Sequence, residues 1–348
     1  MFRIAEYLVQ AEAGLAPQPI LRLLETRGDG SPVFSVFHLL RAVLLVAHGR
    51  MTRRLAGVHV NGAERLSLVR KGVLMAACKA LGVRTILHLH AAELPSTYGR
   101  LSRPGRALVR WIFGLPDCCI VLGQTAADFL QDALMVPPDR VHIVLNGVPE
   151  PTARGQGRQA GRPLRLLFVG NLSERKGVSD LLHALREPAL TGVELELVLA
   201  GGGDVHGYRE LACKLALQDR VTFLGWAEKA LVDRYLAEAD VFILPSRHEG
   251  LPLAILEALA LRVPVVCTPV GEIPHVLKHR KHALLVEPGD RPAIAAALAE
   301  LARSEPLRAG LGRSGRHLYE QHFSMLQFAR RVARIHQEQF GLSAPSRR

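Results

Sequence analysis

The chain has 348 residues, of which 49% are apolar, and its formal charge at neutral pH is +12. This apolar content excludes an intrinsically disordered chain and provides enough material for folded cores. Because a single core rarely grows beyond about 250–300 residues, the length predicts two domains. The positive charge favours anionic partners, such as nucleic acid, a phospholipid surface or phosphorylated substrates, without choosing among them.

The cysteines and the apolar segments bear on the compartment. The cysteines are odd in number and lack metal-type spacing, which is typical of reduced, buried thiols in a cytoplasmic protein: Cys78, Cys118, Cys119, Cys213 and Cys267. The first residues carry Glu6 and do not resemble a signal peptide. The longest apolar segment, residues 31–49, has Arg41 near its centre, which would cost about 2.5–3.5 kcal/mol inside a bilayer. We predict a mostly buried amphipathic helix there, with lipid contact as the alternative.

Strand-like and helix-like runs alternate through the first half of the chain. Strands are predicted at 20–26, 57–62, 84–91, 118–123 and 141–148. Helices are predicted between them at 35–49, 67–81, 102–113 and 125–135. This alternation indicates a parallel sheet with crossover helices.

The alternation resumes after residues 149–163, a segment of Pro, Gly and Arg that we interpret as a linker. Further strands are predicted at 164–170, 193–201, 220–225, 240–245, 263–268 and 283–288. The prediction is therefore an α/β protein with two doubly wound domains, over 1–148 and 164–322, that bind ligands at the carboxyl ends of their strands and in the cleft between them. A helix within 323–340 is expected to pack back toward the N-terminal domain.

The segment "DVFILPSRHEGLPLAILEALA" (240–260) reads as a strand, a loop and a helix. Pro252 suits the first helical turn, and the backbone amides of Gly250 and Leu251 would form an anion site beside it. Glu257 lies about five residues into the helix, roughly 7.5 Å along its axis, where a carboxylate could reach a ribose diol. Glu249 precedes the helix and would face the reacting group. The alternative is structural: Glu249 caps the helix and Glu257 forms a core salt bridge.

Here the sequence resembles a known family. "EGLPLAILEA" is similar to the E-x7-E signature of retaining glycosyltransferases of family 4, which have the GT-B fold of two Rossmann-like domains. "LFVGNLSERKGVSDLLHAL" (167–185) resembles that family's strand, glycine turn and basic pair, which hold the donor diphosphate. The resemblance implies a donor-site turn at Gly170 and Asn171 and diphosphate contacts from Arg175 and Lys176. A solvated turn is the alternative for the basic pair.

Two stretches of the first half resemble a subset that builds bacterial exopolysaccharides and capsules. They are "HVNGAERLSLVRKG" (59–72) and "HLHAAE" (88–93). In that subset His90 would line the acceptor side of the cleft near the donor sugar; the alternative is a hydrogen-bonded histidine at a strand end. His88 shares its face of the strand and is expected to be structural. No D-x-D motif occurs, so the basic pair is expected to replace a metal, and neither metal nor cofactor is predicted.

One part of the family pattern has no counterpart. "MFRIAEYLV" resembles the helix that follows the family's first strand and glycine-rich turn, so these two features are expected to be missing. Their loss would expose sheet edges and remove part of a core. A non-catalytic nucleotide-sugar-binding or scaffolding remnant is therefore an alternative function. An NAD enzyme is a third hypothesis, but the glycines of 199–208 lack the full dinucleotide fingerprint.

The resemblance implies a retaining, metal-independent glycosyltransferase. It would move a hexosyl unit from a UDP- or GDP-sugar to a lipid-linked saccharide, in the cytoplasm or peripherally at the cytoplasmic face of the membrane. The basic residues of 98–113 lie beside Trp111 and could contact an anionic bilayer, with a solvated basic face as the alternative. No nucleic-acid partner is expected, because no aromatic platform or recognition motif accompanies the charge.

Overall fold

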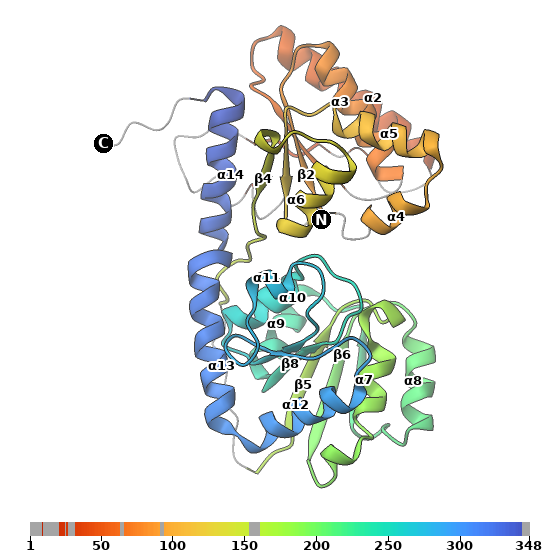
Figure 1. Cartoon of the computed structure of the whole chain (residues 1–348), viewed down its shortest axis with the longest axis vertical. Helices are drawn as coiled ribbons and strands as arrows, with labels where there is room; N and C mark the ends of the chain where they lie inside the picture. The colour runs from red at the N-terminus through yellow and green to blue at the C-terminus, as the bar shows by residue number, and fades with distance from the viewer. Residues whose placement is uncertain are drawn as a thin grey trace, which may run out of the picture. The chain divides into compact units, whose positions relative to one another are not determined.

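A computed structural model describes residues 9, 21–24, 26, 32–62, 66–90, 94–152 and 161–342. These residues form two compact units (Figure 1). Unit 1 combines the chain up to Gly147 with the segment from Met325 onward, and unit 2 runs from Val148 to Ser324. Each unit contains a parallel sheet with helices, so the expected α/β class with two Rossmann-like units is confirmed.

Unit 1 is built on a four-stranded parallel sheet whose strands follow one another in chain order. The strands are β1 (Val58–Gly62), β2 (Thr85–Leu89), β3 (Cys118–Val121) and β4 (Val141–Ile143). The helices of this unit are α2 (Pro32–Met51), α3 (Leu66–Ala80), α4 (Leu94–Arg100), α5 (Arg103–Phe113), α6 (Gln124–Asp128), the π-helical η1 (Phe129–Ala133), the short η2 (Pro138–Arg140) and α14 (Met325–Phe340).

The two faces of this sheet are covered differently. On one face α2, α3 and α5 share a continuous apolar core with the strands, formed by residues such as Val46, Met75, Leu87, Ile112 and Cys119. On the other face α14 packs through Phe328 and His336 against the histidines of β1 and β2. Successive strand residues point to opposite faces, so the alternation of Leu87, His88 and Leu89 serves both layers.

Two predictions for the first half are wrong. Residues 21–24 of the strand expected at 20–26 have no regular structure, and Leu23 and Leu24 are exposed. Apolar β-type residues form a strand only where a neighbouring strand and a core receive them. The helix expected at 35–49 exists as α2, but it is not mostly buried: Ala42 and Val46 face the core, while six large apolar residues on its remaining surface are exposed.

Unit 2 has a six-stranded parallel sheet of order β10-β9-β8-β5-β6-β7. The strands are β5 (Leu164–Val169), β6 (Leu195–Ala200), β7 (Val221–Gly225), β8 (Val241–Leu244), β9 (Val265–Cys267) and β10 (Leu284–Leu285). The order reverses between β5 and β8, because β6 and β7 extend the sheet one way and β9 and β10 the other. In open α/β sheets such a switch point is where ligands bind, at the carboxyl ends of the strands.

The helices of unit 2 connect these strands. They are η3 (Glu174–Lys176), α7 (Val178–Ala184), η4 (Pro188–Leu190), α8 (Val205–Lys214), α9 (Lys229–Glu238), α10 (Leu253–Ala260), α11 (Ile273–Val276), α12 (Arg291–Arg303), α13 (Glu305–Leu318) and η5 (Tyr319–Phe323). Residues 153–160 of the expected linker lie outside the described residues. The cysteines are all free thiols, and Cys213 alone among them is exposed. Within the described part of the chain, no helix is both long and apolar enough to cross a bilayer.

A chain of imidazoles joins the sheet of unit 1 to α14. His336 Nε2 lies 2.8 Å from His59 Nδ1, and His59 Nε2 lies 3.3 Å from His88 Nδ1. The rings of His88 and His90 are in contact, tilted by 32° with their centroids 4.2 Å apart. Burial lowers the pKa of His90 to about 3 and holds the pKa values of His59 and His88 well below 6.5. These three side chains are therefore neutral at physiological pH.

We expect acid to destabilise unit 1 selectively. An unfolded histidine titrates near 6.5, above the pKa values of His59, His88 and His90 in the fold, so the unfolded chain binds more protons as the pH falls. The stability that depends on these neutral rings is complete above pH 6.5. Below that pH each histidine removes up to about 1.4 kcal/mol per pH unit. Hydrogen exchange of the β2 amides at pH 7.5 and 5.5, corrected for intrinsic rates, should reveal the loss.

The β6 amides of unit 2 provide the internal control for this experiment. Their protection should change less than that of β2 over the same pH range. As a matched variant, His206→Ala removes a histidine that is exposed on α8 and should leave the pH response of β2 unchanged. Equal pH dependence of β2 and β6 would contradict the assignment of the acid sensitivity to the imidazole chain.

Candidate active site

The switch point of unit 2 brings together two segments that are distant in the sequence. The chain leaves β5 through the Gly170–Asn171 turn and enters η3, which contains Arg175 and Lys176. It leaves β8 at Leu244 and continues as a loop to α10. Because β5 and β8 are neighbouring parallel strands, the two segments emerge at the same edge of the sheet.

A buried ion pair connects the two segments. Lys176 Nζ lies 2.5 Å from Glu249 Oε1, and the two side chains are 13% and 7% exposed. Each charge would be costly to bury without the other, so the contact fixes both side chains. The structural alternative for Glu249, a helix cap, is not found, since no side chain caps α10. Two residues that the sequence assigned to the site are thus in direct contact.

The backbone of the β8–α10 loop is held against η3. The N–H of Arg247 donates to the carbonyl of Arg175 at 2.8 Å, and Arg175 Nη1 donates to the carbonyl of His248 at 3.0 Å. Gly177, which ends η3, has a φ of +70°, and a Cβ added to it would lie 2.0 Å from the Pro245 carbonyl oxygen. The sharp turn therefore requires glycine for both its conformation and its close approach to the loop.

The segment after β9 holds the other side of the same loop. The N–H of Glu272 donates to the carbonyl of Gly250 at 3.1 Å, and the hydroxyl of Thr268 donates to the carbonyl of Ser246. Gly271 has a φ of +60°, and a Cβ there would lie 2.1 Å from the carbonyl oxygen of Glu249. Glu249 is therefore constrained through its side chain by Lys176 and through its backbone by this segment.

The start of α10 differs slightly from the prediction. The helix begins at Leu253, with Pro252 as its N-cap, so Gly250 and Leu251 lie in the loop and not in the first turn. Glu257 is the fifth residue of the helix, as expected from the spacing. Its Oε1 lies 3.5 Å from Lys229 Nζ on α9, and Lys229 also pairs with Asp233. The structural alternative for Glu257, a salt bridge, is present.

The donor-site turn predicted after β5 packs against the glycine run that follows β6. The N–H of Gly170 donates to the carbonyl of Ala200 at 2.9 Å. A Cβ on Gly201 would lie 1.8 Å from the Gly170 carbonyl oxygen, and one on Gly203 would lie 2.4 Å from that of Leu172. These glycines allow two strand-to-helix turns to touch, which explains them without a dinucleotide. Asn171 is exposed at this edge.

Sequence reasoning missed a second charged cluster beside the loop. Asp180 on α7 is 2% exposed, and its carboxylate lies 2.6 Å from Arg247 Nη2 and 3.2 Å from Arg291 Nε. An aspartate within the apolar run "VSDLLHAL" was the signal that could have revealed it. Its two arginines come from the β8–α10 loop and from α12, so Asp180 adds a third attachment of that loop.

His90 belongs to unit 1, whereas the other candidate residues belong to unit 2. It follows β2, and its Nε2 lies 3.2 Å from Asn61 Oδ1. It shares a face with His88, as the strand alternation predicted. The lowered pKa of His90 leaves a neutral imidazole that can donate one hydrogen bond and accept another but carries no charge.

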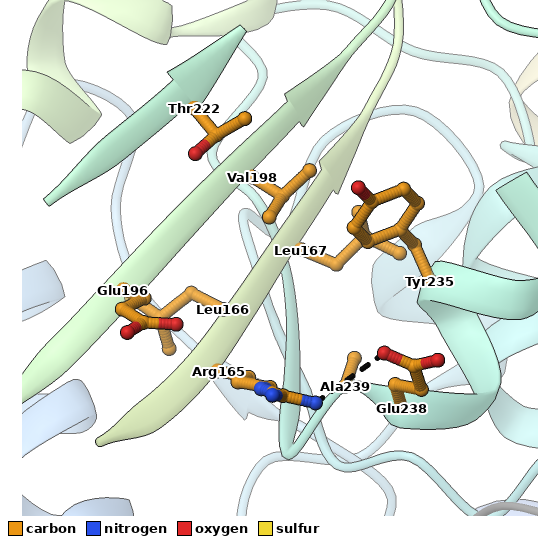
Figure 2. Close-up of a pocket in the computed structure, with 9 residues that line it drawn as sticks. All are labelled: Arg165, Leu166, Leu167, Glu196, Val198, Thr222, Tyr235, Glu238 and Ala239. Atoms are coloured by element: carbon orange, nitrogen blue, oxygen red, sulfur yellow. Dashed lines mark hydrogen bonds and ion pairs between the residues drawn. The ribbon is translucent and has the colours of Figure 1, made fainter. Parts of the chain in front are cut away.

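A separate pocket of about 310 Å³ lies in unit 2, toward the amino-terminal ends of strands β5, β6 and β7 (Figure 2). It is lined by the second residue of each of three strands, Arg165, Glu196 and Thr222, and by Tyr235 and Glu238 of α9. Its charged groups include the pair of Arg165 Nη1 and Glu238 Oε2, 3.3 Å apart. Strand beginnings lie away from the carboxyl ends, so this pocket is not part of the candidate site.

Two family models match consecutive parts of the chain. The one described as Glycosyltransferase Family 4 matches residues 25–150, and the one described as Glycosyl transferases group 1 matches residues 150–318. The boundary between them falls near the boundary between the two compact units.

Two curated relatives are similar over about half of the chain. The amylovoran biosynthesis glycosyltransferase AmsK of Erwinia amylovora is 32% identical over 181 residues, which cover 50% of this chain and 44% of the relative. The putative colanic acid biosynthesis glycosyltransferase WcaL of Salmonella typhimurium is 33% identical over 175 residues, covering 48% and 43%. The matched part thus spans less than half the length of either relative.

Solved structures are similar over nearly the whole chain. A sucrose-phosphate synthase from Thermosynechococcus elongatus gives a TM-score of 0.75 at 20% identity, covering 97% of this chain and 93% of that one. Anabaena HepE in complex with UDP and glucose gives a TM-score of 0.72 at 16% identity, covering 91% and 86%. At such identities the likeness shows the fold, which is GT-B.

We expect the Lys176–Glu249 pair to show strong coupling. Lys176→Met alone leaves a buried carboxylate without its partner and should destabilise unit 2 by about 3–5 kcal/mol. Lys176→Met combined with Glu249→Leu removes both buried charges and should recover most of that loss. Urea unfolding of the single and double variants measures the coupling, and additive losses would contradict a direct buried pair.

Gly177 provides a second test of how the loop is held. Gly177→Ala should destabilise the fold well beyond the cost of a positive φ, because its Cβ meets the Pro245 carbonyl. Gly192→Ala is the matched control: its φ is +74°, but nothing lies within 4 Å of the added Cβ. The control should cost about 1–2 kcal/mol and Gly177→Ala at least about 2 kcal/mol more, measured by thermal unfolding. Equal losses of stability in the two variants would show that the close approach of Gly177 to the Pro245 carbonyl does not add to the cost.

Proposed function

We propose that this chain, which belongs to the glycosyltransferases of family 4, transfers a hexosyl unit from a nucleotide sugar to a saccharide in polysaccharide synthesis. The observation that carries the proposal is the convergence of Arg175, Lys176 and Glu249 at the switch point of unit 2. Cations and a carboxylate held together at the carboxyl ends of parallel strands suit a donor whose leaving group is a diphosphate.

Arg175 and Lys176 are the proposed diphosphate contacts. Departure of the sugar leaves an additional negative charge on the diphosphate, and cations already in place stabilise it without reorganisation. Lys176 is positioned by Glu249, and Arg175 is positioned by the carbonyl of His248, so neither side chain needs to be ordered by the ligand. The backbone amides of Gly250 and Leu251, together with those at the start of α10, would add partial positive charge. No metal is part of this proposal.

The two glutamates have different proposed roles. Glu257 would accept hydrogen bonds from the ribose hydroxyls, with Lys229 orienting its carboxylate. Glu249 would lie beside the donor sugar, where a carboxylate supports positive charge developing at the anomeric carbon. The transfer is proposed to retain the anomeric configuration, as the E-x7-E resemblance implies. His90, as a neutral imidazole, is proposed to hydrogen-bond a sugar hydroxyl from unit 1.

Relatives of the chain support the proposed donor and acceptor classes. HepE has been solved with UDP and glucose, which supports a UDP-sugar, with a GDP-sugar as the other donor class. AmsK is described as an amylovoran biosynthesis glycosyltransferase and WcaL as a putative colanic acid biosynthesis glycosyltransferase. These descriptions support a saccharide acceptor, and we propose that this acceptor is lipid-linked.

A second candidate is a nucleotide-sugar-binding subunit without transfer activity. The described strands of unit 1 run in simple chain order, so no reversal like the one that marks a ligand site in unit 2 occurs among them. This arrangement favours a protein in which unit 2 binds the donor and unit 1 contributes no complete acceptor site.

Ligand-dependent thermal unfolding tests the donor site. We expect one nucleotide class among UDP, GDP, UDP-glucose, GDP-mannose and NAD to raise the unfolding temperature by several degrees, with or without EDTA. Ligand at about 100 times its Kd adds ~2.7 kcal/mol. Glu257→Ala should abolish the shift, whereas Glu210→Ala, on the exposed surface of α8, should retain it.

The same panel separates the two candidates when nucleotide release is measured with saccharide acceptors. Release that depends on Glu249 supports the transferase, and a thermal shift without release supports the binding subunit. A cooperative unfolding transition that no nucleotide shifts would exclude both.

A further inference from the structure

The excess positive charge of the chain belongs almost entirely to unit 1. This unit holds 22 of the 44 Lys and Arg residues but only 11 of the 32 Asp and Glu residues. Between Arg41 and Asp117 the sequence has Glu64 and Glu93 as its only acidic residues. The helices α2, α3 and α5 contain no acidic residue, so their Lys and Arg residues are not balanced by carboxylates within the same helices.

The same helices expose an unusual amount of apolar surface. On α2, Phe37, Leu40, Leu44 and Met51 are 64%, 58%, 69% and 76% exposed. Their spacing of three, four and seven residues places them on one side of the helix, opposite the buried Ala42. A helix that is apolar on both sides normally has a second apolar environment.

Neighbouring helices extend this surface. The helix α3 packs against both α2 and α5, and all three bury residues in one core on one face of the sheet (Figure 1). Their exposed residues therefore face away from that sheet face together. Val69 and Val73 on α3 are 43% and 50% exposed, and Leu108 and Trp111 on α5 are 44% and 53% exposed. We call these residues and the four of α2 the outer apolar surface.

Basic side chains flank the outer apolar surface. Arg41 and Arg50 are exposed on α2, and Arg103, Arg106 and Arg110 are exposed on α5. Such a surface suits an anionic bilayer: the apolar side chains would contact the acyl chains, and the arginines and the tryptophan would lie at the level of the head groups. No described helix is able to cross a bilayer, so the contact would be peripheral.

We infer that the outer apolar surface docks unit 1 on an anionic lipid bilayer. The charge and the apolar character of the surface favour a bilayer over a second copy of the chain or a nucleic acid. A second copy of the chain would bring the same arginines together across a two-fold interface, where like charges repel. A nucleic acid would match the charge but would leave Phe37, Leu44 and Met51 facing phosphates. The inference concerns unit 1 and does not depend on the transfer activity proposed for the chain.

Vesicle co-sedimentation tests this inference with the intact chain. The chain should bind vesicles of 30% phosphatidylglycerol in phosphatidylcholine and bind vesicles of pure phosphatidylcholine at least tenfold more weakly at about 0.1 M salt. Phe37→Ser with Leu44→Ser should lower binding at least tenfold, since two exposed apolar side chains lose their acyl environment. Arg41→Gln with Arg103→Gln should lower it about 25-fold, from a factor of roughly five for each arginine.

The control variant combines Leu326→Ser with Arg330→Gln. Both residues are exposed on α14, which covers the other face of the same sheet, and this variant should bind like the unchanged protein. Circular dichroism confirms that each variant is folded, and the nucleotide-dependent thermal shift of unit 2 should be the same in all of them. Equal binding to neutral vesicles, equal loss in the control, or a dimer that the Phe37 and Leu44 changes dissociate would each overturn the inference.

Discussion

The ion pair of Lys176 and Glu249 is the interaction on which the candidate site depends. It lies in a largely buried position, where either charge alone would be expensive, and it joins two segments that follow adjacent strands. The turn at Gly177 and the backbone of Gly271 both press against the loop that carries Glu249, at distances that no Cβ tolerates. The loop is therefore fixed before any ligand arrives, as catalysis by preorganised charge requires.

Topology explains why part of this site was predictable. The strand pattern predicted β5 and β8, and a parallel sheet places their carboxyl ends at one edge, so Lys176 and Glu249 were expected near each other. The helix spacing also placed Glu257 correctly within α10. The roles of these residues in binding and transfer are proposals.

Other contacts could not be predicted, because they depend on side-chain directions between distant elements. Asp180 receives its arginines from positions 67 and 111 residues away, and His59 meets a histidine 277 residues later. The prediction of a strand at 20–26 was wrong for a related reason. β-type composition gives only a preference for extended structure, and a strand forms only where a partner strand is available. The burial of α2 was overestimated because apolar content alone does not tell which side of a helix faces the core.

The two units differ in how their positive charges are balanced. In unit 2 three cations near the candidate site have carboxylate partners: Lys176 with Glu249, Lys229 with Glu257, and Arg247 with Asp180. Such pairing positions a cation while it limits the long-range field. In unit 1 the arginines of α2 and α5 lie in helices without acidic residues, so their field extends into solvent over about one Debye length. The helices α2, α3 and α5 together carry eight Lys and Arg residues and no acidic residue, so an extended anionic surface, as inferred above, would complement the charge of this layer.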